Sequence, residues 1–239
     1  PWGGANATDA LAALRHFTGM QLQSGLRLRA ADVNATNQVN ATDALQIAQR
    51  FTGALTNFGL GDWVFDEPSI VVNNDTATLQ LGALAVGDIN GSYLPNVQLR
   101  IGDAIELNTR GTTSIQAGVW AIQTDQPVEL GAISLSLLLP EGVQIHGVKV
   151  PLSKQSAYFK QEGRELRISW FSLEPLLLGT GDDLLQLFFH ANESNVFGAL
   201  HLNPGCELAD AWAQPLTGVQ LSAARLQDVR LLDLEVRNY

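Results

Sequence analysis

The residues best suited to chemistry in this sequence are a run of oxygen-bearing side chains between positions 32 and 43. Counted from the first of them, they fall at positions 1, 3, 5, 9 and 12, which is the ligand spacing of a calcium-binding loop. Ca²⁺ takes about six to eight oxygen ligands, and a tight loop supplies them by turning alternate side chains inward. The run therefore predicts a Ca²⁺ site with these ligands: the side chains of Asp32, Asn34, Thr36 and Asp43, the backbone carbonyl of Gln38, and Asn40 directly or through water.

This loop departs from the EF-hand pattern at two positions. Position 6 is Asn37 rather than glycine, and asparagine tolerates the left-handed backbone that a sharp turn needs. Position 12 is Asp43 rather than glutamate, so only two carboxylates face the ion, and we expect weak affinity, in the extracellular range of about 10⁻⁴–10⁻³ M. The alternative is an Asn- and Thr-rich turn that caps a helix and binds no metal.

Part of this motif is repeated. The sequence NATDAL at residues 6–11 recurs at 40–45, and FTG at 17–19 recurs at 51–53 in the same register. Two loop–helix units in tandem resemble the type I dockerin, over about residues 1–56. The resemblance implies a small helical domain that binds Ca²⁺ and docks on a protein partner.

The first copy of the motif is cut short. Asn6 and Asp9 match ligand positions, but residues 1–4 stand where the early ligands would be. Either the natural chain begins upstream of Pro1, or this first site binds no metal.

Helices are expected over residues 5–20 and 44–51, joined by a short helix or turn within 22–31. In the first helix an apolar stripe is expected to pack in a core: Leu11, Leu14, Phe17 and Met20. If the dockerin resemblance extends to binding, the partner-facing residues are Arg15, His16, Gln46, Gln49 and Arg50.

Residues 57–96 are expected to connect two domains, with strands at 63–65, 70–72 and 77–81. Within them, Asp88, Asn90 and Ser92 repeat the opening of the calcium loop, but no position-12 carboxylate follows. Two interpretations remain open, a further weak cation site or a plain Asp/Asn/Gly turn. The segment resembles one that follows dockerin-type repeats in large secreted proteins of Bacteroidetes-like bacteria.

From residue 97 onward, short runs of alternating apolar and polar residues separated by turns predict an antiparallel β-sandwich. The expected strands cover residues 119–122, 132–139, 143–150, 165–171, 184–190, 199–202, 220–226 and 231–236. The predicted fold class is therefore multidomain, α plus all-β, with a helical domain at 1–56, a connection at 57–96 and a sandwich at 97–239.

Three phrases in the sandwich region carry a second resemblance: GAISLSLLLPEGV at 131–143, RELRISWFS at 164–172 and GDDLLQLFF at 181–189. They resemble a cohesin or the related carbohydrate-binding sandwiches, over about residues 97–227. The resemblance implies a jelly-roll sandwich that binds a protein partner or a polysaccharide.

Composition narrows the function classes. A formal net charge of −10 argues against nucleic acid and anionic membranes as partners. No stretch reaches about eighteen consecutive apolar residues, so no membrane span is expected. The single cysteine, Cys206, excludes an intrachain disulfide and is expected as a buried thiol. Few Lys and Arg residues and many Asn, Thr and Gly residues are typical of secreted modular proteins, which predicts an extracellular or bacterial cell-surface location.

No catalytic motif stands out. The four histidines are scattered, and the sequence contains no nucleophile elbow, phosphate loop or HExxH motif, so we expect no enzymatic activity. Trp120, Trp170 and Trp212 either form an aromatic platform for sugar or pack in the core.

These patterns lead to one hypothesis and two alternatives. The hypothesis is a non-catalytic, calcium-stabilised, extracellular assembly or adhesion module, in which dockerin-like and cohesin-like faces meet within one chain or join copies head to tail into a filament or surface layer. The first alternative is a carbohydrate-binding or scaffolding appendage of a larger secreted polysaccharide-degrading protein. The second is a stalk with no ligand of its own.

Overall fold

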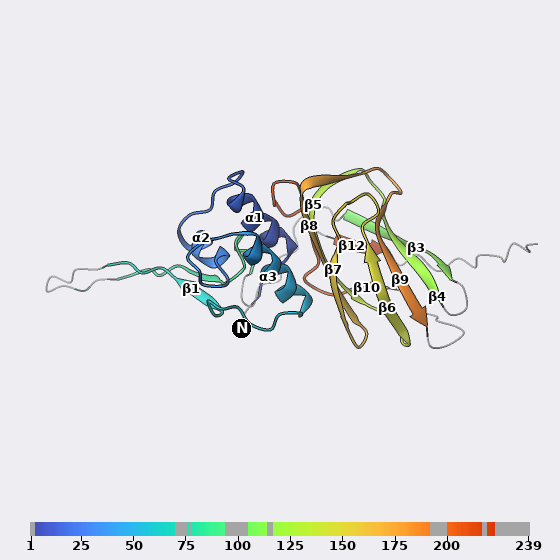
Figure 1. The fold of residues 1–239 in the computed structure, drawn as a ribbon, viewed down its shortest axis with the longest axis horizontal. Helices are drawn as coiled ribbons and strands as arrows, with labels where there is room; N and C mark the ends of the chain where they lie inside the picture. The colour runs from blue at the N-terminus through green and yellow to red at the C-terminus, as the bar shows by residue number, and fades with distance from the viewer. Residues whose placement is uncertain are drawn as a thin grey trace, which may run out of the picture.

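A computed structural model describes residues 3–69, 76, 78–93, 105–113, 117–191, 200–216 and 219–222. The N-terminal part holds three helices, α1 (Ala7–Phe17), α2 (Gly25–Ala31) and α3 (Ala41–Thr52). The C-terminal part is a β-sandwich, and the helices lie beside the sheet that contains β5 and β8 (Figure 1). Predicted helices and strands are therefore present in both regions.

The two long helices begin in the same way because the repeated sequence caps them. The side chain of Asn6 accepts a hydrogen bond from the Thr8 amide, and the side chain of Asp9 accepts one from the Asn6 amide. The equivalent residues cap α3. Such reciprocal capping satisfies amide groups that the first helical turn leaves unpaired.

The predicted apolar stripe of the first helix is only partly in the core. Leu11 is fully buried, whereas Phe17 and Met20 are each 56% exposed. The helix ends at Phe17, so the helical spacing that would have placed Met20 on the same face no longer applies.

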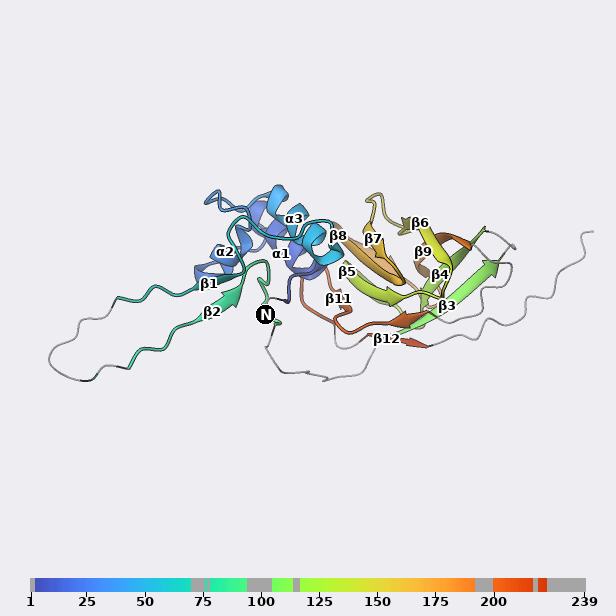
Figure 2. The same ribbon diagram turned by 90° about the horizontal axis from the view of Figure 1, so that it is seen from below.

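Residues 58–93 complete the helical part. The strands β1 (Trp63–Phe65) and β2 (Ala83–Ala85) form an antiparallel pair that projects away from the sandwich (Figure 2). The second strand lies at 83–85 rather than 77–81, and the predicted strand at 70–72 lies outside the described residues. Phe58, Val64, Val86 and Ile89 are buried in the same apolar cluster as the helices. We call the described residues from 3 to 93 the helical unit.

The sandwich consists of two sheets, and antiparallel pairing prevails in both. One sheet has the order β10-β5-β8-β7, with β11 also paired to β5; the other has the order β12-β3-β4-β9-β6, in which β12 is parallel to β3. The strands are β3 (Ile105–Thr113), β4 (Ala117–Thr124), β5 (Val128–Leu138), β6 (Val143–Lys149), β7 (Tyr158–Glu162), β8 (Glu165–Leu178), β9 (Asp183–Ala191), β10 (His201–Leu202), β11 (Glu207–Ala209) and β12 (Val219–Ser222). The predicted sandwich is confirmed, although β3, β7 and β11 were not anticipated. The expected strand at 231–236 lies outside the described residues.

Strand β5 is buried on both faces. Ile133, Leu135 and Leu137 belong to the sandwich core. Ala132 and Ser134 point to the opposite face, because side chains alternate along a strand, and they are buried as well. A second layer must therefore cover the outer face of β5, and that layer is the helical unit.

The core distinguishes between the two interpretations of the three tryptophans. Trp120 and Trp170 are buried in the sandwich core, and the indole nitrogen of Trp170 donates to the hydroxyl of Ser153. Only Trp212 of the three remains exposed. Among the described residues, no helix is long and apolar enough to cross a membrane.

Candidate functional site

The predicted calcium-binding residues 32–43 fold into one tight loop. The carboxylate of Asp32 accepts hydrogen bonds from the amides of Thr36 (2.9 Å) and Asn37 (2.7 Å). The carboxylate of Asp43 closes the loop by accepting from the amides of Asn34 (3.4 Å) and Asn40 (2.9 Å). We call this segment the continuous loop.

The backbone of the continuous loop is bent as a tight turn requires. Asn37 has a φ of 61°, as its position in the motif predicted, and Ala35 has a φ of 58°. The hydroxyl of Thr36 donates to the carbonyl of Gln38 at 3.2 Å, and Asn40 caps α3. The structure thus brings the six predicted ligands into one turn, while metal binding itself stays a prediction. Burial raises the pKa of Asp43, partly opposed by the hydrogen bonds from Asn40 and Asn34.

A second turn of the same kind begins at residue 88. The carboxylate of Asp88 accepts from the amides of Ser92 (2.9 Å) and Tyr93 (3.0 Å). The side-chain oxygen of Asn90 also accepts from the Ser92 amide, at 2.9 Å. These three contacts correspond one for one to those of Asp32 and Asn34 in the continuous loop.

The missing half of this second turn comes from the start of the chain. The amide of Asn90 donates to Asp9 at 3.0 Å, as Asn34 does to Asp43. Asp9 also accepts from the amide of Asn6 at 3.1 Å. We call residues 6–9 and 88–93 together the split loop. The sequence analysis placed these residues in two separate, incomplete motifs, whereas in the structure a hydrogen bond joins the two segments.

The split loop concentrates negative charge away from solvent. Asp9 is 0% exposed and Asp88 is 1% exposed. Burial raises the pKa of Asp9 well above its ordinary value, and the nearby charge of Asp88 raises it further. The ion pairs among the described residues involve neither of them. Nor do any three His, Cys, Asp or Glu side chains in the described ranges group as a metal site, so a cation at either loop would also need amide, hydroxyl or carbonyl oxygens.

The helical unit contacts the outer face of one sheet. Helix α1 packs against β5, β8 and β11, and α3 packs against β8 and β7 (Figure 2). Ala132 and Ala209 of the sheet belong to the apolar cluster of the helices, and Phe171 packs against it. Small residues on β5 permit the close approach, since a Cβ atom on Gly131 would lie 2.7 Å from Cδ2 of Leu11.

Specific polar contacts lie along the α1 side of this interface. The amide of Ala7 donates to the hydroxyl of Ser134 at 2.8 Å. Asn6 donates its side-chain nitrogen to Glu207 at 3.1 Å, and the Thr8 hydroxyl donates to the same carboxylate. Burial raises the pKa of Glu207, partly opposed by these two hydrogen bonds.

Arg15 does not lie on an exposed face of the helices, as the predicted partner face requires. Its side chain is 4% exposed instead of facing solvent, and it donates to the carbonyl of Ala211. Its guanidinium group lies 4.2 Å from the centre of the Trp212 ring. These contacts of Arg15 are therefore part of the interface between the helical unit and the sandwich of the same chain.

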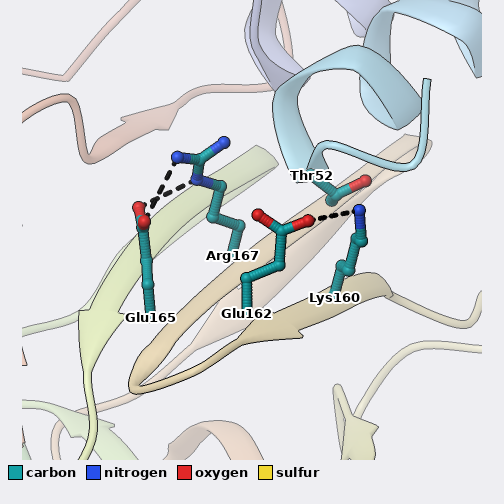
Figure 3. A pocket seen from close by; sticks show the side chains of 5 residues that line it. All are labelled: Thr52, Lys160, Glu162, Glu165 and Arg167. Carbon is teal, nitrogen blue, oxygen red and sulfur yellow. Dashed lines mark hydrogen bonds and ion pairs between the residues drawn. The ribbon is translucent and has the colours of Figure 1, made fainter. Parts of the chain in front are cut away.

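The α3 side of the interface is polar and lies over the β7–β8 hairpin (Figure 3). Lys160 donates to the carbonyl of Gly53 at 2.8 Å, at the C-terminal end of α3, where a cation is favoured. Arg167 donates twice to Glu165, at 2.8 and 3.2 Å. The hydrogen bond from Arg167 lowers the pKa of Glu165.

Comparison with known proteins finds likenesses in fold only. No protein family profile matches the sequence, and no curated protein matches it. A cohesin from scaffoldin B of Acetivibrio cellulolyticus, solved in complex with a mutant dockerin, is 9% identical, with a TM-score of 0.42 over 52% of this chain and 100% of that chain. A non-cellulosomal cohesin from Archaeoglobus fulgidus is 15% identical, with a TM-score of 0.37 over 49% of this chain and 85% of that chain. The ChBD2 structure from Thermococcus kodakarensis is 14% identical, with a TM-score of 0.28 over 44% of this chain and 92% of that chain.

Sequence reasoning missed Ser134 and Glu207 as interface residues. A signal for Ser134 was present, because Ala132, Ser134 and Ser136 alternate with large apolar residues along one strand. Small residues on the outer face of a strand are what a closely packed helix requires. No comparable pattern surrounds Glu207.

Proposed function

We propose that this chain is a non-catalytic, extracellular protein-interaction module for assembly or adhesion, in which the helical unit is docked on its own sandwich and the continuous loop holds Ca²⁺. The supporting observation is the interface of α1 and α3 with the β5–β8–β7 face. It combines an apolar centre with polar contacts at Ser134, Glu207 and Gly53.

This interface bears on self-association. A head-to-tail filament would use the helices of one copy and a sheet face of the next, but here α1 already covers β5 within the same chain. Copies would then associate by exchanging helical units, a domain swap that reuses the same contacts between chains. The closed chain therefore stays a monomer, and opening it is the step that permits assembly.

Size-exclusion chromatography with light scattering, over a range of protein concentrations with Ca²⁺ present, tests this proposal. The expected result is a compact monomer for the unaltered chain and a monomer of larger hydrodynamic radius for Leu11→Asp, because the charge disrupts the buried interface within a chain and equally between copies. Leu22→Asp, at a residue 75% exposed, is the matched control and stays as compact as the unaltered chain. Polymers of the unaltered chain, or a folded Leu11→Asp variant as compact as the unaltered chain, contradict the closed form.

One observation favours the carbohydrate-binding alternative. Trp212 is 59% exposed, and Arg15 lies against its ring from the buried side. An exposed, fixed aromatic ring is suited to stack on a sugar. A glycan array separates this alternative from the leading proposal. Sugar binding that Trp212→Ala abolishes supports the carbohydrate-binding alternative, and the absence of binding to every glycan on the array rules that alternative out.

A further inference from the structure

We propose that His146 and His190 form a binding site for a divalent transition metal, and that Zn²⁺ is an ion which their two imidazole rings suit. The two residues lie on neighbouring strands, β6 and β9, of the sheet with the order β12-β3-β4-β9-β6. Helices α1 and α3 pack against strands of the other sheet. The site therefore goes beyond the proposed function, because neither the closed interface nor the continuous loop depends on it.

Folding brings these two histidines into contact, although they are far apart in the sequence. Their ring centres lie 4.2 Å apart, and the ring planes differ by 17°. Strands β6 and β9 are antiparallel, and the register shifts between Ile145 and Gly147, which leaves His146 with no residue paired opposite it. Such a bulge bends the strand and re-aims the side chain of the extra residue. The ring of His146 accordingly lies nearer to His190 than to Phe188, whose ring centre is 6.4 Å away.

Both rings lie on the solvent side of this sheet. Phe189 belongs to the sandwich core, and side chains alternate along a strand, so the side chain of His190 points away from that core. His146 and His190 are both exposed. A solvated ion can therefore reach both rings.

The ring nitrogens of this pair are available for a metal ion. Within the described ranges, no hydrogen bond or ion pair involves the imidazole of His146 or His190. His16 differs, because its Nδ1 accepts a hydrogen bond from the amide of Gln23 at 3.0 Å. The neutral form of each ring in the pair thus offers one nitrogen lone pair to an ion.

Two imidazoles suit a transition metal better than Ca²⁺. Imidazole nitrogen is a ligand that Zn²⁺ and Cu²⁺ prefer, whereas Ca²⁺ takes oxygen ligands. Zn–N bonds of about 2.0–2.1 Å at a tetrahedral angle place two ligand nitrogens about 3.4 Å apart. Rings with centres 4.2 Å apart reach this separation by turning about their side-chain bonds. In the part of the chain that the structure describes, no third His, Cys, Asp or Glu side chain groups with the pair, so water completes the coordination.

Zinc titration by calorimetry tests the proposal, on the full chain with Ca²⁺ in excess to saturate the continuous loop. We expect about one Zn²⁺ per chain. His146→Ala and His190→Ala should each weaken binding at least about tenfold, because losing even an outer-shell partner of a metal ligand costs about 10–100-fold. The matched control is His201→Ala, at an exposed histidine of the other sheet, which should bind Zn²⁺ like the unaltered chain. Unchanged binding in either pair variant, or an equal loss in the control, overturns the proposal.

Nuclear magnetic resonance distinguishes one shared ion from two histidines that bind separately. Paramagnetic Cu²⁺ below one equivalent should broaden the ring signals of His146 and His190 together, while the His201 signal stays sharp. In His146→Ala, the same amount of Cu²⁺ should leave the His190 signal largely sharp, because the second ligand is gone. A His190 signal broadened as strongly in this variant as in the unaltered chain contradicts a shared site.

Thermal unfolding distinguishes a metal site from a pair of rings that only stack. In chelator, each pair variant should melt near the temperature of the unaltered chain, because both side chains are exposed. In Zn²⁺, the unaltered chain and His201→Ala should melt higher than the pair variants, because only they retain the stabilisation from binding. Pair variants that melt lower by the same amount in chelator and in Zn²⁺ would show a stacking role and overturn the metal site.

Discussion

The backbone amide of Asn90 donates a 3.0 Å hydrogen bond to the carboxylate of Asp9, although the two residues are 81 positions apart. In the continuous loop the same contact joins Asn34 to Asp43, only nine positions apart. The same local geometry is therefore formed once within a single loop and once between two distant segments of the chain. The contact from Asn90 to Asp9 makes residues 88–93 part of the helical unit instead of a simple connection.

Calcium should stabilise the chain. We expect Ca²⁺ at a hundred times its dissociation constant to raise the free energy of unfolding by about 2.7 kcal/mol for one site. For a chain of this size, each kcal/mol of added stability is expected to raise the melting temperature by about 2–4 °C. Scanning calorimetry with Ca²⁺ and with excess chelator measures the difference, and identical melting curves would contradict calcium binding.

The close packing at Gly131 can be tested by adding one methyl group. Gly131→Ala should destabilise the chain by about 1–3 kcal/mol, because the new Cβ would overlap the backbone carbonyl oxygen of Asp210 and, in the helix–sheet interface, Cδ2 of Leu11. Gly147→Ala on β6 is the control, since its Cβ would lie 3.5 Å from the nearest atom of Phe188. Urea unfolding measures the effect of both substitutions, and an equal effect would argue against this close packing around Gly131.

Glu165 gives stability that depends on pH. Its pKa is lowered in the folded chain by the hydrogen bond from Arg167, so the contribution is present above the unfolded pKa and is lost as the pH falls through the folded pKa. Because the pair is partly exposed, we expect less than about 1 kcal/mol. Glu165→Gln should therefore lower stability near neutral pH but not in acid. Urea unfolding between acid and neutral pH measures the difference in unfolding free energy between Glu165→Gln and the unaltered chain. Glu129→Gln, at an exposed residue, is the control. A loss of stability in Glu165→Gln that does not change with pH would be evidence against this contribution.

Cys206 should react slowly in the folded chain. Burial raises the pKa of its thiol to about 11 from a reference value of 9.0. At a pH below both values, a shift of this size lowers the thiolate fraction about 100-fold. Alkylation followed by mass spectrometry, in buffer and in denaturant, should differ by at least this factor. Equal rates would place the thiol in solvent.

Local patterns in the sequence were sufficient for several elements. The repeated NATDAL motif specified two capped helices, because capping depends on residues within one turn. The spacing of Asp32 to Asp43 specified a tight loop for the same reason, since its contacts join residues at most nine positions apart. Alternation in residues 132–139 specified a strand and which side chains face the core.

Only the tertiary structure decided how these elements combine. Asp9 and Asp88 each look like half of an incomplete site in the sequence, and only folding brings the two halves together. Likewise, no local pattern shows that Arg15 is buried against Ala211, because its neighbours on the helix are the same in either environment. Spacing along the chain specifies geometry within one turn or strand, whereas contacts between distant segments depend on how whole elements pack.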